Sequence, residues 1–281
     1  MRLVTYDSGR GPRAGVLAGD SVVDVWDALG EPAGEPSLAA LLIEGRVEEA
    51  ARELDSGSRQ PLSEVALLPP IPGPQKVVCI GLNYRSHAEE AGQEPPTTPT
   101  FFAKFANALA APGADVALPA SSRKVDYEAE VAFVVGRQAR AVAEAEALDH
   151  VAGYMLLNDL SARDLQFATP QWMPGKVFDG AAPCGPALVT PDEAGAPDAI
   201  AIELTLNGEV MQSATTADLI HSIPFLLSHL STLMTLEPGD IVSTGTPAGV
   251  GSTREPRVWL KAGDEVVITS PTLGRLETHL R

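Results

Sequence analysis

Two glutamates separated by one residue are the strongest local sign of chemistry in this sequence. Glu128 and Glu130 lie in the segment DYEAEVAFVV, and side chains at positions i and i+2 of a strand project from one face. Carboxylates so close together repel each other, and a shared hard cation such as Mg²⁺, Mn²⁺ or Ca²⁺ relieves the repulsion. Two solvated acids on an exposed strand face would give the same motif, so the pair indicates a metal site without establishing one.

A third acid, Asp159, follows the apolar run GYMLLN at a place where a helix is expected to begin. An aspartate in that position is by default an N-cap, whose carboxylate accepts hydrogen bonds from the first backbone N–H groups of the helix. Arg163 and Gln166 follow within the next turns. A metal ligand beside a cation and an amide would form a compact pocket for an anion.

A histidine and a glutamate at helical spacing indicate acid–base chemistry. His87 and Glu90, in GLNYRSHAEE, stand at positions i and i+3, where the carboxylate can orient the imidazole and raise its basicity. A surface ion pair would have the same spacing. Residues 91–99, AGQEPPTTP, have little to contribute to a core, and we expect a loop that is able to move over a site.

Two glycine-flanked segments add further candidates. GKVFDG places Lys176 in a loop, and TGTPAGVG places Thr246 directly after an expected strand. The backbone N–H groups of the second segment could hold a carboxylate, although a plain loop would have the same composition. Competing signatures fail, because GVGSTR lacks the third glycine of a dinucleotide fingerprint and the sequence has no Walker A, GxSxG or HExxH motif.

The elements that must position these residues are mainly strands. We expect strands at residues 76–81, 131–135, 201–207, 240–244, 257–260 and 264–270, and helices near 83–91, 160–167 and 216–234. Residues 1–68 mix short apolar stretches with a helical pattern over 38–54, and the proline-rich run LLPPIPGP then forms a stiff linker. The sequence predicts a β-rich α+β fold, with a small N-terminal α+β domain at 1–70 and a catalytic domain at 71–281.

Composition restricts the partners of this chain. Its 281 residues carry a formal charge of −17, which disfavours nucleic acid and anionic membranes. No apolar run reaches the roughly 18 residues of a membrane span, residues 1–10 lack the apolar core of a signal peptide, and only two widely separated cysteines occur. We expect a cytoplasmic protein that binds neither nucleic acid nor membrane, and that attracts a carboxylate substrate through a local cluster of positive charge.

Taken together, the motifs resemble the fumarylacetoacetate hydrolase superfamily. A GxNYxxHxxE segment, an ExE pair, a D(x)SARDxQ helix start, a GKxFD loop and a TGTPxGVG loop occur in the order of that family between residues 76 and 251. Such matches in register are specific, whereas each alone is not. The resemblance implies the mixed β-sheet roll of that family, commonly assembled as a homodimer, with the small N-terminal domain of one bacterial branch.

The resemblance also implies roles for individual residues. His87 would be the general base, on a lid that orders when substrate binds. Val177 departs from the small or polar residue that the family more often has after its lysine, which puts the shape of the pocket in question. The implied metal ligands, for Mg²⁺ or Mn²⁺, are Glu128, Glu130 and Asp159; the implied catalytic residues are His87, Glu90 and Lys176; and the implied binding residues for a small carboxylate substrate are Arg163, Gln166, Thr246 and Arg85.

A 2-oxo acid can chelate a divalent cation, which then accepts the electrons released when a neighbouring bond breaks. We therefore expect a Mg²⁺-dependent hydrolase that cleaves a C–C bond in a small β-diketo or 2-oxo acid of acylpyruvate or fumarylpyruvate type, through an enolate, with His87 activating the water. Oxaloacetate-type decarboxylation is a close alternative, and hydroxymuconate-type isomerase or hydratase chemistry comes third. A non-catalytic binding protein is least expected, because it needs no base beside its metal.

Overall fold

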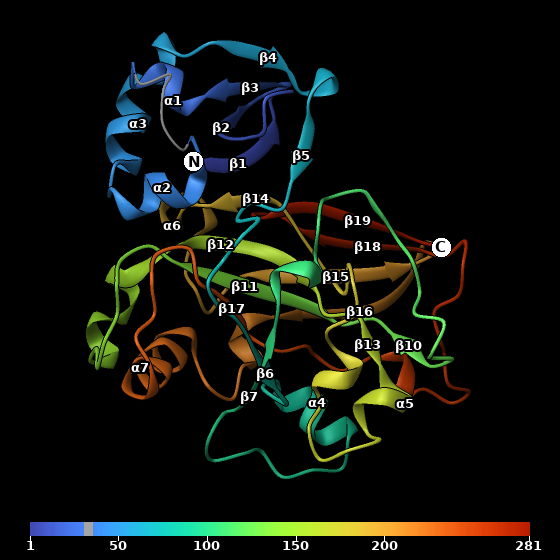
Figure 1. Cartoon of the computed structure of the whole chain (residues 1–281). Coiled ribbons are helices and arrows are strands. Elements are labelled where there is room, and N and C mark those ends of the chain that lie inside the picture. Colours follow the sequence, from blue (N-terminus) through green and yellow to red (C-terminus); the bar gives the residue numbers. More distant parts are fainter. Residues whose placement is uncertain (31–35) are drawn as a thin grey trace.

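The computed structural model describes residues 1–30 and 36–281 and shows a smaller lobe, built from the first part of the chain, above a larger β-rich body (Figure 1). In the smaller lobe, Gly45 at φ +66° ends one helix and a second begins two residues later, so the helical pattern expected over residues 38–54 forms two short helices. The elements of this lobe are strands β1 Arg2–Asp7, β2 Pro12–Ala18, β3 Ser21–Asp24, β4 Arg59–Pro61 and β5 Ala66–Leu68, and helices α1 Val25–Ala28, α2 Leu38–Ile43 and α3 Val47–Glu53.

The larger body consists mostly of strands, with short helices at its periphery (Figure 1). Its helices are α4 Arg85–Glu90, α5 Arg163–Gln166, α6 Pro191–Ala194 and α7 Ile223–Leu233. Its strands are β6 Val77–Gly81, β7 Thr100–Lys104, β8 Leu109–Ala110, β9 Ala114–Val116, β10 Val125–Asp126, β11 Ala129–Val135, β12 Val151–Asn158, β13 Ser161–Ala162, β14 Ala182–Val189, β15 Ala201–Leu206, β16 Glu209–Thr215, β17 Ile241–Ser243, β18 Glu265–Ser270 and β19 Gly274–Leu280.

The strands of the described residues form two larger sheets and one small pair. The first sheet has twelve strands in the order β4-β3-β2-β1-β14-β12-β11-β17-β6-β7, with β5 also paired to β1 and β8 to β14. The second has the order β16-β15-β18-β19-β9, and β10 pairs with β13. Most pairs are antiparallel, whereas β6 runs parallel to β17, β8 to β14 and β9 to β19. This is a mixed α+β architecture, so the expected fold class is confirmed.

Strand β1 joins the two lobes. It pairs with β14 of the larger body, Arg2 opposite Val189 and Leu3 opposite Leu188, so the first sheet passes from one lobe into the other. The proline-rich segment is packed against this junction, with Ile71 buried and the Thr5 hydroxyl donating to the Pro70 carbonyl at 2.6 Å. The assignment of residues 1–70 and 71–281 to separate domains stays a prediction.

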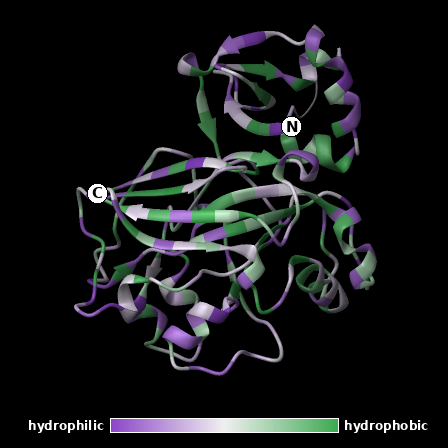
Figure 2. Ribbon diagram, turned by 180° about the vertical axis from the view of Figure 1, so that it is seen from behind, coloured by the Kyte–Doolittle hydropathy of each residue, from purple (hydrophilic) through white to green (hydrophobic). Residues whose placement is uncertain are grey.

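The central strands of the first sheet are buried on both faces. All seven residues of β11 are buried, and so are most residues of β12 and β14. The second sheet covers one face, where β15 contacts β11, and β18 and β19 contact β12. Green, hydrophobic residues accordingly dominate the middle of the body in Figure 2. A charged side chain at the end of β11 or β12 therefore lies next to a region that excludes water.

Two expected elements differ from the structure. Residues 257–260 form no strand, because the backbone N–H groups of Val258 and Leu260 donate to two unrelated carbonyls, those of Gly251 and Val125. The helix expected from residue 216 begins at Ile223. Its start is fixed by the Ser222 side chain, which caps the Phe225 N–H, and by a proline in the first turn.

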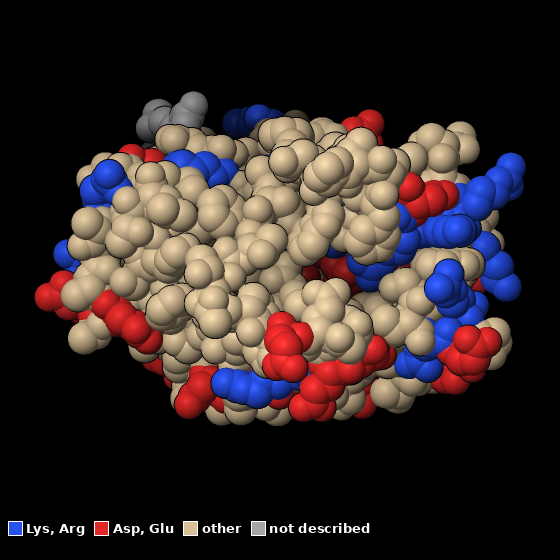
Figure 3. Space-filling model, turned by 90° about the horizontal axis from the view of Figure 1, so that it is seen from below, with Lys and Arg blue, Asp and Glu red and all other residues tan. Residues whose placement is uncertain are grey.

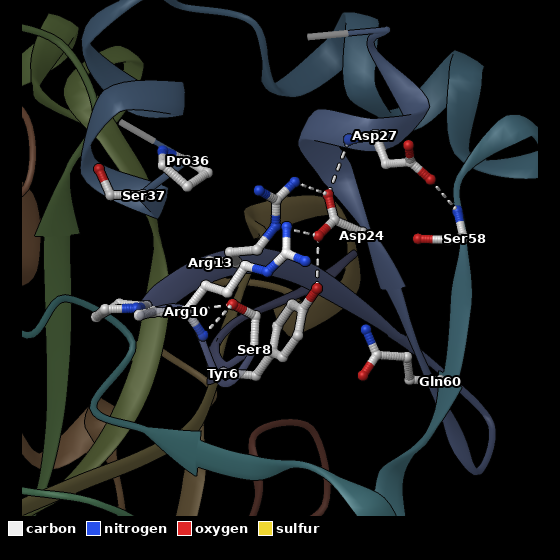
Figure 4. A pocket seen from close by; sticks show the side chains of 12 residues that line it. Tyr6, Ser8, Arg10, Arg13, Asp24, Asp27, Pro36, Ser37, Ser58 and Gln60 are labelled. Carbon is white, nitrogen blue, oxygen red and sulfur yellow. Dashed lines mark hydrogen bonds and ion pairs between the residues drawn. The ribbon is translucent and has the colours of Figure 1, made fainter. Parts of the chain in front are cut away.

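One buried carboxylate organises the smaller lobe. Asp24 accepts hydrogen bonds from the Tyr6 hydroxyl and from Nε and Nη2 of Arg13, and it caps α1 through the Asp27 N–H at 2.8 Å (Figure 4). Burial opposes ionisation of this group, but the bonds from Arg13, Tyr6 and Asp27 outweigh it and lower the pKa of Asp24. Strand β1, strand β2 and helix α1 thus depend on one charge.

We expect Asp24→Ala to lower the free energy of unfolding by about 3 kcal/mol, because it leaves Arg13 without its partner and α1 without its cap. Since the pKa of Asp24 is lowered, its contribution is present above the pKa of an unfolded aspartate and is lost as the pH falls, so the deficit should shrink below about pH 4. Urea unfolding of both proteins at pH 7 and pH 3.5 measures this. Asp20→Ala, at an exposed acid between β2 and β3, is the control, and an equal loss there would refute the assignment.

Candidate active site

Strand pairing brings three carboxylates together. Ala129 of β11 lies opposite Asn158 of β12, so the residues at the start of one strand meet those at the end of the other. Oxygen atoms of Glu128, Glu130 and Asp159 all lie within 4.8 Å of one another. The three residues are 5%, 2% and 1% exposed, which rules out a solvated strand face. Asp159 is not an N-cap either, because β13 intervenes and α5 begins only after Ala162.

Three cations contact this acid cluster. Nζ of Lys176 lies 2.7 Å from Oε2 of Glu128 and 2.9 Å from Oδ2 of Asp159. Nη2 of Arg163 lies 2.7 Å from Oε1 of Glu128, and Nζ of Lys104 lies 2.7 Å from Oδ1 of Asp159. Two of the cations were expected at the site from the sequence, whereas Lys104 was missed. No local spacing marks Lys104, because β7 shows no alternation of buried and exposed residues.

A close approach of backbone segments sets Lys176 in place. The preceding Gly175 lies against α5, where an added Cβ would meet the Ala162 carbonyl oxygen at 2.4 Å and the Gln166 N–H nitrogen at 2.5 Å. A side chain at this position would push the lysine loop away from the acids. Val177, the expected departure from the family pattern, does not line the pocket, so it leaves the shape of the pocket unchanged.

The buried charges do not balance. Asp126 also belongs to the cluster, since its Oδ2 lies 2.8 Å from Nη2 of Arg163, so four carboxylates face three cations. Burial, followed by the nearby Asp159 and Glu128 charges, raises the pKa of Glu130 to about 8. Burial also opposes ionisation of Glu128, but Arg163 and Lys176 lower its pKa to about 2. With all four carboxylates ionised the cluster would carry one surplus negative charge, and Glu130 is the carboxyl that relieves it by holding a proton below about pH 8.

A divalent cation fits this donor set. Oxygen ligands of this kind suit Mg²⁺ and Mn²⁺. Within residues 1–30 and 36–281, Glu130 forms no ion pair, and its Oε2 accepts from the Ser243 hydroxyl and from the Gly245 N–H at 3.1 Å. One divalent ion would turn a surplus of one negative charge into a surplus of one positive charge. The site would then attract an anion into a chain whose formal charge is −17.

His87 and Glu90 form the expected pair. Nδ1 of His87 lies 3.0 Å from Oε2 of Glu90, and the other oxygen of Glu90 accepts from the Gly249 N–H at 2.9 Å. Burial opposes ionisation of Glu90, but these hydrogen bonds lower its pKa, so it stays ionised and holds a proton on Nδ1. Nε2 is the nitrogen that remains free. His87 lines the same pocket as the carboxylates, and Glu90 supports it from behind.

Helix α4, which carries His87, is fastened at its start. The Ser86 N–H and hydroxyl both donate to Asp218 Oδ2, and the Asn83 side chain bonds the backbone of residue 221 and the Thr244 carbonyl. Arg85 donates to the Leu219 carbonyl at 2.7 Å and does not line the pocket, so the structure does not bring this expected substrate-binding residue to the site. Ordering of a lid on substrate binding stays a prediction.

The TGTPAGVG loop binds carboxylates of the protein itself. Its N–H groups at Gly245, Gly249 and Gly251 donate to Glu130, Glu90 and Asp126 respectively. The glycine at 249 is required, because it has φ +102° and an added Cβ would meet the Met211 carbonyl oxygen at 2.1 Å. The loop thus fixes the site by binding the protein's own carboxylates, where the sequence left open a ligand-binding loop or a plain one.

Thr246 and Gln166 lie at the pocket with part of their hydrogen-bonding capacity in use. The Thr246 hydroxyl donates to the Ala129 carbonyl at 3.0 Å and accepts from Gln212 at 2.8 Å, so only one lone pair remains for a ligand. Gln166 Oε1 accepts from Arg163 Nη1 at 3.0 Å, which leaves its amide N–H groups for a ligand.

The pocket has a volume of about 330 Å³. Viewed from the end of the molecule that carries α4 and α5, the surface is hollowed, with acidic atoms at depth and basic atoms beside them (Figure 3). The expected residues that line it are Glu128, Glu130, Asp159, His87, Arg163, Gln166, Lys176 and Thr246.

The fold and site together define an α+β protein with a buried oxygen-ligand cluster beneath a histidine–glutamate pair. The family model described as fumarylacetoacetate (FAA) hydrolase, C-terminal, matches residues 76–281, so this chain belongs to the fumarylacetoacetate hydrolase family. It is 39% identical to the mitochondrial oxaloacetate tautomerase FAHD2A of Bos taurus, over 98% of this chain and 90% of the relative.

Two solved structures are similar over the whole chain. One is maleylpyruvate hydrolase from Sphingobium sp. SYK-6 in complex with manganese (II) ion and pyruvate, at 32% identity and a TM-score of 0.83, covering 100% of this chain and 98% of the other. The second is 5-carboxymethyl-2-hydroxymuconate delta-isomerase from Mycobacterium smegmatis, at 33% identity and a TM-score of 0.80, covering 100% and 99%. These enzymes confirm the family and the catalytic fold that the sequence predicted.

The finer expectations are not all tested by these similarities. The bovine relative is eukaryotic and aligns with nearly the whole chain, so membership of a bacterial branch is not confirmed. No helix in residues 1–30 or 36–281 is long and apolar enough to cross a bilayer. The homodimer, the cytoplasmic location and the absence of nucleic-acid and membrane partners stay predictions.

We expect metal affinity to rise with pH. Because the pKa of Glu130 is raised to about 8, this carboxyl holds a proton at lower pH that a cation must displace. The association constant for Mn²⁺ should therefore increase about tenfold per pH unit below pH 8 and level off above it. Calorimetry at pH 6 to 9, in buffers of different ionisation enthalpy, measures the affinity and the released proton. A pH-independent affinity would contradict the raised pKa.

Replacing different ligands should separate metal binding from folding. Asp159→Asn leaves Lys104 and Lys176 each short of a buried partner, so it should lower the unfolding free energy in chelator by about 3 kcal/mol as well as weaken Mn²⁺ binding. Glu130→Gln keeps an acceptor for Ser243 and Gly245, so it should weaken Mn²⁺ binding with little change in stability. Urea unfolding with chelator and Mn²⁺ calorimetry test both variants. Retention of full Mn²⁺ affinity by Glu130→Gln would refute the assignment.

Proposed function

We propose that this chain is a divalent-metal-dependent enzyme that interconverts the keto and enol forms of a small 2-oxo acid, with oxaloacetate as its first substrate. The observation that carries the proposal is that His87, whose Nδ1 is paired with Glu90, lines the same pocket as the three buried carboxylates. The bovine relative named as an oxaloacetate tautomerase supports the choice of substrate. From the sequence alone C–C bond hydrolysis is the first expectation, whereas the relative named as a tautomerase favours tautomerisation.

Glu128, Glu130 and Asp159 would hold the metal, either Mg²⁺ or Mn²⁺. The cation would supply positive charge to the substrate's C2 oxygen, which gains electron density as the substrate enolises. Lys176 and Arg163 keep Glu128 ionised and fixed in position, since each contacts one of its oxygens. Lys104 contacts one oxygen of Asp159, and Lys176 contacts the other. The ligand set is therefore rigid before any substrate enters.

His87 would move the proton. In the keto form, the C3 proton goes to Nε2, the electron pair of the broken C–H bond forms the C2–C3 double bond, and the π pair of the C2 carbonyl moves to its oxygen. Transfer of the proton from Nε2 to the C2 oxygen then gives the enol, and the opposite sequence returns the keto form. In a neutral imidazole, the Glu90 carboxylate favours the proton on Nδ1, which leaves Nε2 as the acceptor. No bond between carbons breaks, so one group that accepts the proton and returns it is sufficient.

Hydrolysis of an acylpyruvate is the second candidate. The electrons of the breaking C–C bond would move toward the C2 oxygen, as they do in tautomerisation. His87 would instead deprotonate a water that adds to the distal carbonyl. The neighbour named as a maleylpyruvate hydrolase, with manganese and pyruvate bound, favours this reaction. Oxaloacetate decarboxylation and isomerisation of a hydroxymuconate-type acid need the same enolate and are further outcomes of the experiment below.

We expect His87→Ala to lower kcat for oxaloacetate tautomerisation by roughly 10²–10⁴-fold, because general acid–base groups typically contribute that much. KM should change less, since the carboxylate cluster is untouched. Loss of the enol absorbance in the ultraviolet is followed at fixed Mn²⁺, with protein-free metal solution as the baseline. Glu89→Ala, an exposed residue of α4, is the matched control. An unchanged kcat in His87→Ala would refute the role of this residue.

The same preparations distinguish the alternatives. Acylpyruvate hydrolysis should fall as steeply as tautomerisation in His87→Ala, whereas decarboxylation requires no proton abstraction and should fall much less. A wild type that hydrolyses an acylpyruvate far faster than it tautomerises oxaloacetate would restore hydrolysis to first place. Release of pyruvate and CO₂ from oxaloacetate, faster than enol conversion, would favour the decarboxylase.

A further inference from the structure

Beyond the charge cluster, the wall of the pocket is aromatic. Phe102 lies nearest, with its ring centre 5.0 Å from Nζ of Lys176, and the Trp172 ring packs against it edge to face at 5.9 Å. Phe167 lines the same pocket and is 66% exposed. The three rings thus lead from the buried acids toward solvent.

The aromatic wall is packed closely against the backbone. Phe102 and Lys104 share one face of β7, so the strand that delivers a cation to Asp159 also delivers the first ring. The Trp172 ring lies directly on Gly81 at the end of β6, where an added Cβ would approach its Cζ3 atom to 2.2 Å. Gly81 is therefore the residue that allows the indole to form the wall.

Charge is unevenly distributed along the pocket. Among the described lining residues, the only lysine and arginine are Lys176 and Arg163, and both contact Glu128 at the metal end. The outer part adds Glu94, which is negative. A second carboxylate several carbons from the reacting end of a substrate would face aromatic rings and an acid, and no further lysine or arginine among the described lining residues would compensate for its lost hydration.

We propose that the site selects 2-oxo acids whose distal end is apolar, and that Phe102 and Trp172 determine this specificity against long-chain dicarboxylates. The inference rests on the proposed function only for the placement of the 2-oxo acid end at the carboxylate cluster. Oxaloacetate is compatible with it, because its second carboxylate is attached to C3, the carbon that reacts at His87, and does not reach the aromatic wall. The acyl groups of longer substrates lie along the rings and bury apolar surface.

The test is a binding comparison between two acids of equal length. 2-Oxooctanoate and 2-oxooctanedioate present the same 2-oxo acid end and differ only in a terminal methyl or carboxylate, and pyruvate reports the anchoring end alone. With Mn²⁺-loaded wild type, calorimetry should give a Kd for 2-oxooctanoate at least about tenfold lower than for the diacid. The diacid should bind no more tightly than pyruvate. Equal or tighter binding of the diacid, or no gain of 2-oxooctanoate over pyruvate, would overturn the proposal.

Two variants test whether Trp172 causes the preference for an apolar distal end. Trp172→Arg places a cation in the wall and should reduce or reverse the difference between the two acids. Trp172→Gln, the uncharged control, should weaken 2-oxooctanoate without strengthening the diacid. An unchanged preference in both variants would remove Trp172 from the proposal.

Tautomerisation of oxaloacetate is measured on the same wild-type preparation. A failed reaction with an intact binding preference rejects the proposed function alone. An intact reaction without the binding preference rejects the aromatic selectivity alone.

Discussion

Mutual neutralisation of buried charge is the constraint on which this structure depends. An ionised group buried alone costs several kcal/mol, and a buried pair remains stable only if its partners are held in good geometry. Separate elements supply the members of the cluster, and each is fixed by its own neighbours. The members are Lys104 from β7, Asp126 from β10, Glu128 and Glu130 at the start of β11, Asp159 after β12, Arg163 from α5 and Lys176 from the loop before β14. The surplus carboxylate gives the cluster a donor set that fits a divalent cation.

The sequence predicted the parts of this arrangement that depend on local spacing. An i, i+2 pair on a strand and an i, i+3 pair on a helix follow from backbone geometry, so Glu128 with Glu130 and His87 with Glu90 were found before the fold was known. Lys104 was missed because its role depends on the order of strands in the sheet. The N-cap reading of Asp159 failed for a similar reason, since β13 pairs with β10 and delays the start of the helix.

The glycine-rich loop shows how a correct motif can carry an incomplete interpretation. The sequence left open whether its N–H groups hold a carboxylate or the segment is a plain loop, and those at Gly245, Gly249 and Gly251 bind the protein's own Glu130, Glu90 and Asp126. One loop therefore connects the metal cluster to the acid–base pair. A family that shares this loop can keep its electron-accepting centre constant while the outer wall of the pocket varies. This variation accounts physically for the tautomerase, hydrolase and isomerase names among relatives of one fold.

The long-range pairing of β6 has a consequence for the growing chain on the ribosome. This strand runs parallel to β17, and the neighbouring Lys76 and Asp240 that join them are 164 residues apart. Until residue 240 has been synthesised, β6 has one unpaired edge, and Glu130 lacks the Ser243 and Gly245 groups that bind it. Most of the chain must therefore wait, partly assembled and with an open strand edge, until β17 has been synthesised. Such a nascent chain is open to edge-to-edge association, so its yield in cells should depend on chaperones more than its final stability would suggest.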